Sequence, residues 1–202
     1  MTKITIDYFQ KLKKSNSMFA TLTAYDYTSA MLVDGAEIPL ILVGDSAAMV
    51  VFGYETTIPV SMDEMVFLVS SVSRGAKRAL VVADMPFLSY QVSVENAIFN
   101  AGRFIKEANA QAVKLEGGEE YVDRIEAIVN AGIPVVAHIG LTPQSFHQMS
   151  GYKVQGKSVS DAEKLINDAK AIESAGAFAL VLEGIPSELA KMVTESISIP
   201  TI

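Results

Sequence analysis

Cysteine and tryptophan are absent from the 202-residue chain, and basic residues are few. Without cysteine the chain has no disulfide, no thiolate metal site and no cysteine nucleophile, and this composition fits a reducing compartment. The net charge of −7 argues against a nucleic-acid binder, which needs clustered Lys and Arg. No apolar run approaches the roughly 18 uncharged residues of a membrane span, and the N-terminus lacks the apolar core of a signal peptide. We therefore expect a cytoplasmic protein with no membrane or nucleic-acid partner.

Apolar residues make up 50% of the chain, which is enough for one sizeable core. They gather in short runs that lack clean polar alternation, as is typical of parallel strands buried on both faces. Six such runs lie at 18–25, 40–43, 79–83, 112–115, 134–137 and 178–182, and a seventh begins at 199.

Helix signals lie between these runs. Ser61 and Ser160 are each followed three residues later by a glutamate, which is the pattern of a capping box at a helix start. Gly132 and Gly176 follow helically spaced apolar residues and are expected to end helices. The alternation of strands and helices predicts either a (β/α)₈ barrel or an open doubly wound sheet.

Weak internal repeats support this repeating unit. Ile-Pro occurs at 38–39, 133–134 and 199–200, each time where a predicted helix gives way to a predicted strand. The segment 112–117 also resembles the segment 179–184. Such repeats are expected when one strand–helix unit is used several times.

A polar residue ends nearly every predicted strand, and in a barrel these positions converge on one rim, where the strand–helix loops build the active site. The chain also has no Gly-x-Gly-x-x-Gly after its first strand, which weakens the dinucleotide-binding alternative. We therefore predict an α/β fold of the (β/α)₈ barrel type. The polar residues are Asp26, Asp45, Asp84, Glu116, His138 and Glu183.

Acids and a histidine without cysteine indicate a hard cation bound by oxygen ligands, such as Mg²⁺. A cation at such a rim could chelate a 2-oxo acid and polarise its carbonyl, while a carboxylate away from the metal removes a proton from the neighbouring carbon. Two long segments without helical or strand periodicity, 46–59 and 142–157, are of the length expected for functional loops. The second is interpreted as a lid that excludes water.

Several motifs together resemble one family, ketopantoate hydroxymethyltransferase. They occur in family order over essentially the whole chain. The matching stretches are 23–27 (TAYDY), 43–46 (VGDS), 83–87 (ADMPF), 113–118 (VKLEGG), 138–145 (HIGLTPQS), 151–156 (GYKVQG) and 182–183 (LE).

The resemblance implies a barrel that transfers a one-carbon unit from 5,10-methylenetetrahydrofolate to 3-methyl-2-oxobutanoate, giving 2-dehydropantoate on the route to pantothenate and coenzyme A. It also implies a large homo-oligomer and a role for each matching residue. Mg²⁺ would be held by Asp45 and Asp84, with Glu116 at or near the metal. The 2-oxo acid would contact Asp45, Ser46, Asp84, Lys114 and His138, and Glu183 would accept the proton.

Each of these residues also has a simpler structural interpretation. Asp45 and Ser46 could cap a following helix, and Asp84 could be a turn residue. Lys114 and Glu116 lie two apart on one strand face, so they could form only a mutual ion pair.

The remaining site residues have alternatives of the same kind. Glu183 could pair with a nearby lysine at a strand end, and a lone histidine such as His138 is often a satisfied core residue. Asp26 is expected to order the turn between Tyr25 and Tyr27 rather than to touch a metal.

We expect residues 1–202 to form a single (β/α) barrel domain whose seventh strand contains Ile202. The resemblance implies two further strand–helix units after that point. Two alternative functions remain open from the sequence. One is another metal-dependent lyase or mutase barrel acting on 2-oxo acids. The other is a truncated, non-catalytic paralogue that serves as a structural subunit.

Overall fold

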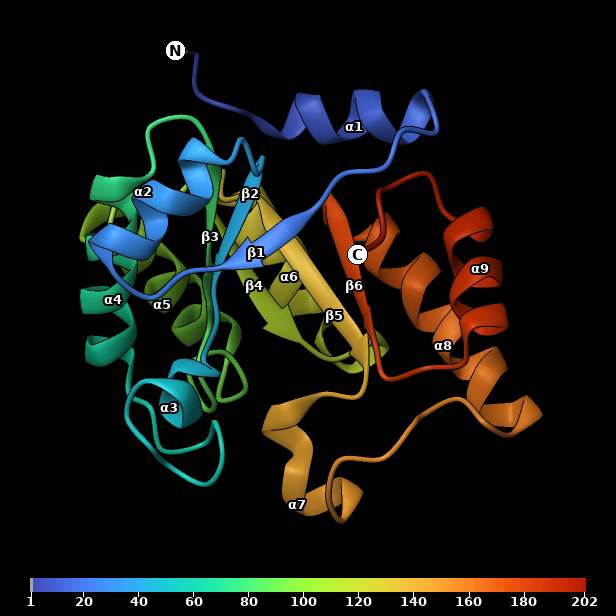
Figure 1. Cartoon of the computed structure of the whole chain (residues 1–202). Coiled ribbons are helices and arrows are strands. Elements are labelled where there is room, and N and C mark those ends of the chain that lie inside the picture. Colours follow the sequence, from blue (N-terminus) through green and yellow to red (C-terminus); the bar gives the residue numbers. More distant parts are fainter. Residues whose placement is uncertain (1) are drawn as a thin grey trace.

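A parallel β-sheet forms the centre of the computed structural model, which describes residues 2–202 (Figure 1). Each strand pairs in parallel with the next strand along the chain, so the order in the sheet is the order in the sequence. A doubly wound sheet would need a reversal of that order, so this alternative is excluded. The strands are β1 (Thr21–Thr23), β2 (Leu40–Val43), β3 (Leu80–Asp84), β4 (Ala112–Glu116), β5 (Val135–Gly140) and β6 (Ala179–Glu183).

Helices follow the strands and cover the outer face of the curled sheet, as Figure 1 shows. The longer ones are α2 (Tyr27–Gly35), α4 (Met62–Gly75), α5 (Val94–Lys106), α6 (Val122–Asn130), α8 (Val159–Ser174) and α9 (Ser187–Ser196). Short helical turns lie in the loops: α3 (Ala47–Val50), η1 (Glu119–Tyr121), η2 (Pro143–Ser145) and α7 (Phe146–Met149). Helix α1 (Ile6–Lys14) precedes the sheet. No helix within residues 2–202 is long and apolar enough to cross a bilayer.

Two helix starts test the capping signals. The Ser61 hydroxyl accepts a hydrogen bond from the Glu64 amide, and the Glu64 carboxylate accepts one from the Ser61 amide, so the predicted capping box is confirmed. The predicted start of α8 at Ser160 is wrong by two residues, because Ser158 is the capping residue and accepts from the Asp161 amide. Both serines precede an acid by three positions, so the sequence pattern fits either start.

The strand predictions hold best in the middle of the sheet. Every residue of β3, β4 and β5 is buried, as expected for strands covered on both faces. The first strand is much shorter than the run 18–25 and is half-exposed, and β6 becomes exposed towards its end. Burial on both faces was therefore a wrong prediction for these two strands, which lie at the outer positions of the strand order.

The three Ile-Pro dipeptides share one structural role. The carbonyl of Pro39 accepts a hydrogen bond from Leu80, that of Pro134 from Val113, and that of Pro200 from Leu180. Proline has no amide hydrogen but keeps its carbonyl, so it can begin a strand whose neighbour donates to it. The segment at Thr201 forms a parallel bridge with Leu180, which places it beside β6 as the predicted seventh strand requires.

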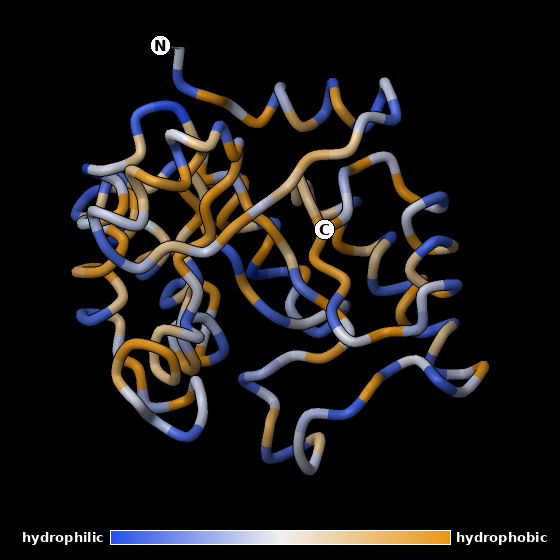
Figure 2. The backbone as a smooth tube through the Cα atoms, viewed as in Figure 1, coloured by the Kyte–Doolittle hydropathy of each residue, from blue (hydrophilic) through white to orange (hydrophobic). Residues whose placement is uncertain are grey.

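The inner face of the sheet changes character along the strands. At the amino ends it carries apolar side chains, and Phe9 of α1 is fully buried against them together with Phe19 and Phe178. Figure 1 shows α1 lying across this end of the sheet, and Figure 2 shows the apolar central strands. Helix α1 thereby closes the amino end of the sheet. Phe9 and the apolar side chains packed around it, Leu80 and Val82 among them, are called the apolar plug.

The same inner face is charged at the carboxyl ends. Asp84 is paired in register with Lys114, and Glu116 with His138. Because side chains alternate across a strand, residues two apart share a face, so Leu80 and Val82 of the apolar plug lie on the same face as Asp84. The fold therefore gathers buried charge at one end of an otherwise apolar interior.

Replacing Phe9→Ala should test the plug. The change removes a fully buried ring, so we expect the free energy of unfolding, measured by urea denaturation, to fall by about 3–5 kcal/mol. As a control, Met18→Ala alters a side chain that is 99% exposed and should change stability by less than about 0.5 kcal/mol. Equal stabilities of the two variants would show that α1 does not contribute to the core.

Candidate active site

Five residues with ionisable side chains form one continuous line of contacts at the carboxyl end of the sheet, which Asp45 joins through its backbone amide. The amide of Asp45 donates to Asp84 Oδ2 at 3.3 Å, and Lys114 Nζ lies 2.9 Å from Asp84 Oδ1. Lys114 Nζ is also 3.8 Å from Glu116 Oε1, which in turn lies 3.5 Å from His138 Nδ1. These residues come from the ends of β2, β3, β4 and β5, so the fold brings together side chains that are distant in the sequence.

Glu183 extends this line at the end of β6. Its Oε2 lies 3.3 Å from His138 Nε2, and its side chain is 47% exposed, whereas that of His138 is 2% exposed. The alternative interpretation of Glu183 as the partner of a lysine finds no support among residues 2–202, because its ion-pair contact is with His138. Gly140 makes this approach of β5 and β6 possible, because a Cβ there would lie 2.2 Å from the Glu183 carbonyl oxygen.

The capping interpretation fails for Asp45 and Ser46. Neither side chain caps α3. Asp45 Oδ2 instead accepts from the side-chain Nε2 of Gln144, and Ser46 Oγ lies 2.8 Å from the Tyr25 hydroxyl. Asp84 likewise does not stabilise a turn, because its carboxylate contacts Asp45 and Lys114. All three residues therefore direct their side-chain contacts into the site.

Asp26 does not belong to this cluster. It is the N-cap of α2, where its carboxylate accepts from the amide of Ser29 and its own amide donates back to the Ser29 hydroxyl. Asp26 thus caps a helix instead of ordering a turn between Tyr25 and Tyr27, because Tyr27 already belongs to α2.

Burial and charge shift the pKa values of the cluster in different directions. Burial and the neighbouring charge of Asp84 raise the pKa of Asp45 to about 8, and burial also raises the pKa of Asp84 despite the Lys114 ammonium. Burial opposes the charged form of Lys114, but the surrounding carboxylates outweigh it and raise the pKa of that ammonium. Two buried acids thus share one buried cation.

Glu116 and His138 stabilise each other as an ion pair. Burial alone would raise the pKa of Glu116, but its contacts with His138 and Lys114 outweigh burial and lower that pKa. For His138, burial and Lys114 disfavour the proton, while Glu116 and Glu183 favour it more strongly and raise the pKa of the imidazole. The arrangement therefore favours an imidazolium between two carboxylates.

The site can hold a divalent cation through Asp45 and Asp84. The charges of Asp84 and Glu116 raise the pKa of the buried Asp45 carboxyl, and a hard cation would relieve this with ligands of the preferred type. No group of three or more His, Asp or Glu side chains within residues 2–202 is arranged to hold a metal. Glu116 already contacts Lys114 and His138 and accepts a hydrogen bond from the backbone amide of Gln144. Mg²⁺ commonly uses only one or two protein carboxylates, so the pair formed by Asp45 and Asp84 suits this ion.

Gln144 and Tyr90 are buried at the site, although neither is among the predicted site residues and only Gln144 falls within a matching stretch, 138–145. Gln144 contacts Asp45, while Tyr90 OH accepts from the Glu116 amide at 3.1 Å. Gln144 lies within the segment 142–157, which was expected to lack regular structure but contains η2 and α7. Helices of three and four residues are too short to show a periodic pattern, so that expectation was wrong for a physical reason.

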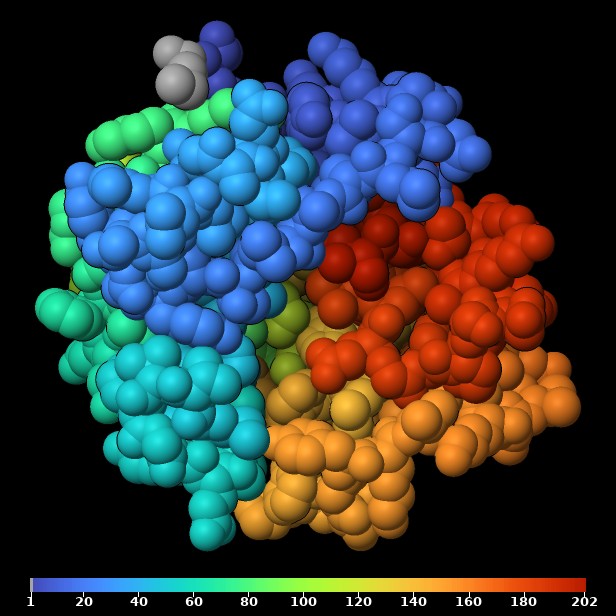
Figure 3. Space-filling view, in the orientation of Figure 1, coloured from blue at the N-terminus to red at the C-terminus, as the bar shows by residue number. Residues whose placement is uncertain are grey.

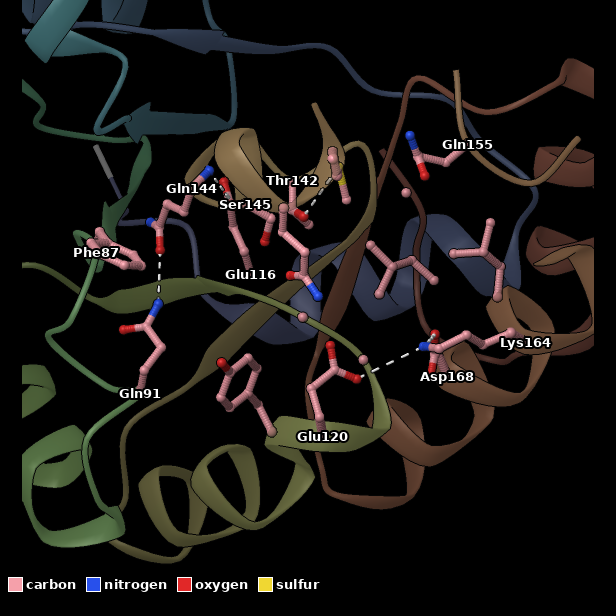
Figure 4. Close-up of a pocket in the computed structure, with 18 of the residues that line it drawn as sticks. Phe87, Gln91, Glu116, Glu120, Thr142, Gln144, Ser145, Gln155, Lys164 and Asp168 are labelled. Atoms are coloured by element: carbon pink, nitrogen blue, oxygen red, sulfur yellow. Dashed lines mark hydrogen bonds and ion pairs between the residues drawn. The ribbon is translucent and has the colours of Figure 1, made fainter. Parts of the chain in front are cut away.

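A cavity of about 940 Å³ adjoins the charged line on the side of Glu116 and Gln144. Figure 4 shows Phe87, Gln91, Thr142 and Gln155 around it, with Glu120, Lys164 and Asp168 at its far end. Figure 3 shows the surface hollowed between the segment around α3 and the segment around α7. The loop 142–157 thus lies at the cavity, as its interpretation as a lid requires.

The raised pKa of Asp45 predicts a pH-dependent stability in the presence of a chelator. Between about pH 4 and 8 the folded chain keeps the Asp45 proton that the unfolded chain releases, so stability is lost as pH rises through this window. Relative to Asp45→Asn, the wild-type free energy of unfolding should therefore fall by up to about 1.4 kcal/mol per pH unit. Urea denaturation at pH 4, 6 and 8 measures this difference.

The exposed Glu163 on α8 provides a matched control. Glu163→Gln should leave the pH dependence of the wild-type stability unchanged. A constant difference in stability between wild type and Asp45→Asn across the three pH values would contradict the raised pKa.

Solved structures share this fold at low sequence identity. A putative phosphonomutase from Burkholderia cenocepacia J2315 aligns with a TM-score of 0.78 and 19% identity over 97% of this chain and 81% of its own. A phosphonopyruvate hydrolase gives 0.74 and 17% over 100% and 71%. A 2,3-dimethylmalate lyase of the PEP mutase/isocitrate lyase superfamily gives 0.70 and 20% over 97% and 70%. These likenesses concern the fold alone.

Sequence relatives are much closer. The 3-methyl-2-oxobutanoate hydroxymethyltransferase of Carboxydothermus hydrogenoformans is 54% identical over 202 residues, which cover 100% of this chain and 73% of the relative. That of Clostridium novyi is 57% identical over 200 residues, or 99% of this chain and 73% of the relative. The family model described as ketopantoate hydroxymethyltransferase matches residues 3–202. The chain therefore belongs to the ketopantoate hydroxymethyltransferase family.

Proposed function

We propose that this chain transfers a hydroxymethyl group from 5,10-methylenetetrahydrofolate to 3-methyl-2-oxobutanoate, giving 2-dehydropantoate. Membership of the family supports the reaction. The observation that carries the proposal is the division of the acids: Asp45 and Asp84 are buried side by side, while Glu183 lies apart and half-exposed beyond His138. One pair suits a cation and the separate acid suits proton transfer.

Asp45 and Asp84 would hold Mg²⁺ or a similar divalent cation, with Glu116 beside it. When bound, the cation would act as a Lewis acid on the carbonyl of the 2-oxo acid. The Lys114 ammonium and the Ser46 hydroxyl would orient the 2-oxo acid, which the contact of Lys114 with Asp84 and the position of Ser46 directly after Asp45 support. These residues supply the positive charge and the donor that a carboxylate substrate needs.

Glu183 would accept the proton from C3 of the 2-oxo acid. A carboxylate within reach of solvent and held at one oxygen can take up a proton and release it. His138 Nε2 lies 3.3 Å from Glu183 Oε2 and its Nδ1 lies 3.5 Å from Glu116 Oε1, so an imidazolium there would attract both carboxylates. His138 is 1% exposed and does not line the cavity, so it would support the 2-oxo acid site through these two acids.

The cavity beside Glu116 supports a second, larger substrate. Its volume of about 940 Å³ lies at the upper end of typical ligand sites and exceeds the need of a five-carbon 2-oxo acid. Aromatic side chains such as Phe87 and Tyr121 line it together with the carboxylate of Glu120. A flat, nitrogen-rich ring such as that of the folate donor fits walls of this chemistry.

Deuterium exchange tests the proton transfer without folate. Proton NMR of 3-methyl-2-oxobutanoate in D₂O with Mg²⁺ should show loss of the C3 proton signal. Glu183→Gln keeps the size of the side chain but cannot accept the proton, so exchange should slow by at least about 10²-fold. Glu163→Gln, an exposed change on α8, is the matched control and should exchange at the wild-type rate.

The same assay separates the alternatives. Exchange that persists in Glu183→Gln would contradict the role of that residue. A lyase or mutase would convert its 2-oxo acid without a folate, whereas the proposed reaction forms 2-dehydropantoate only when 5,10-methylenetetrahydrofolate is added. Folded protein without any exchange would favour the non-catalytic paralogue.

We also propose that the curled sheet belongs to a single (β/α)₈ barrel domain of a cytoplasmic homo-oligomer. The sequential parallel order and the clustering of charged residues at the carboxyl ends support the barrel. The lack of cysteine suits the cytoplasm. Exposed apolar side chains on neighbouring outer helices support assembly: Leu32 on α2, Phe67 on α4 and Phe99 on α5.

Light scattering after size-exclusion chromatography tests the assembly. We expect a mass that is a multiple of 21.7 kDa, and Phe67→Glu should lower it, because a charge disfavours burial in an apolar contact. Glu163→Gln should leave the mass unchanged. A wild-type mass of a single chain would overturn the oligomer.

A further inference from the structure

Gln144 has no part in the proposed chemistry, yet its side chain is 4% exposed and occupies the junction between the charged line and the cavity. Its Nε2 donates two hydrogen bonds, to Asp45 Oδ2 at 2.9 Å and to the carbonyl oxygen of Met85 at 2.9 Å. The residue therefore joins the loop after β5 to the loops after β2 and β3.

The other half of the amide is equally engaged. Oε1 of Gln144 lies 2.9 Å from the Tyr90 hydroxyl and accepts from Gln91 Nε2 at 3.1 Å, the contact drawn in Figure 4. The backbone amide of Gln144 donates to Glu116 Oε2 at 3.0 Å. A side-chain amide offers two donors and two acceptor sites, and each has a partner here, although the Tyr90 hydroxyl shares its one proton between Gln144 Oε1 and the Glu116 carbonyl oxygen at 2.9 Å.

The network leaves Gln144 only one useful orientation. Because Nε2 lies against two acceptors, Asp45 Oδ2 and the Met85 carbonyl oxygen, reversing the amide would set the Gln144 oxygen against both of them. Within residues 2–202, the side-chain hydrogen bonds of Asp45 engage Oδ2, which leaves Oδ1 available to a ligand. Fixing one oxygen of a carboxylate in this way determines where the other points.

We propose that Gln144 is a positioning residue that orients Asp45 and Glu116 and thereby sets the affinity of the site for a divalent cation. The inference rests on the proposed function only in assigning the cation to Asp45 and Asp84. Gln144 would touch neither the cation nor the 2-oxo acid. Its effect would pass through the two carboxylates that it holds by its side chain and its backbone.

Isothermal titration with MgCl₂ alone tests the proposal without turnover. Gln144→Met keeps the volume and removes both donors, so the Kd for Mg²⁺ should rise by about 10- to 100-fold, the usual range for partners of metal ligands. The rate of C3 proton exchange at saturating Mg²⁺ should fall by a much smaller factor than the Kd rises. Gln148→Met is the matched control, because Gln148 lines the same cavity but is exposed, and its Kd should equal that of wild type.

Two further variants separate positioning from simple support of the fold. Tyr90→Phe removes the hydroxyl on the opposite side of the network and leaves the donor to Asp45 in place. It should lower the midpoint of thermal unfolding while the Kd for Mg²⁺ changes less than about threefold. Gln144→Asn keeps an amide in the buried site but is one methylene too short. It should weaken Mg²⁺ binding even if Gln144→Met fails to fold.

The outcomes are distinct for the two levels of the argument. Wild-type Mg²⁺ affinity in folded Gln144→Met and Gln144→Asn would overturn the proposal, as would a wild-type chain that binds no Mg²⁺. A chain that binds Mg²⁺ through this network but does not exchange the C3 proton would instead refute the proposed function and leave the role of Gln144 intact.

Discussion

The ion pair between Lys114 and Asp84 is the constraint on which the site depends. Both side chains are at most 5% exposed, and each would be costly to bury without the other. The ammonium also lies near Glu116, and the charges of Glu116 and Asp45 raise its pKa, so Lys114 and the imidazolium favoured at His138 together balance the buried acids. The apolar plug at the other end of the strands supplies the stability that such a cluster does not.

Strand geometry explains why the sequence was informative about this cluster. In a parallel sheet with sequential order, all carboxyl ends lie at one edge, so a polar residue after each buried run predicts convergence without knowledge of the helices. The i, i+2 spacing of Lys114 and Glu116 likewise places both on one face. The same reasoning was less reliable at the outer strands, where the burial of β1 depends on what lies beside it and not on its own pattern.

The parts that the sequence could not predict are those set by contacts between loops. Gln144 follows no buried run and belongs to a three-residue turn, so neither periodicity nor strand ends single it out. Its importance arises from the simultaneous approach of the loops after β2, β3 and β5 and the end of β4, which only the folded chain creates. The start of α8 is a similar case on a smaller scale, because two serines carry the same capping pattern and local sequence cannot choose between them.

His138 makes one site out of acids with different environments. The carboxylates of Asp45 and Asp84 are buried beside the Lys114 ammonium, whereas Glu183 is half-exposed at the edge of the site. Enzymes commonly give like groups unlike tasks by placing them in unlike surroundings. Here the imidazole lies between Glu116 and Glu183. A displacement of the buried residues would therefore also change the contact of the rigid ring with Glu183. The position of Glu183, the proposed proton acceptor, therefore depends on the same buried charges that would hold the cation.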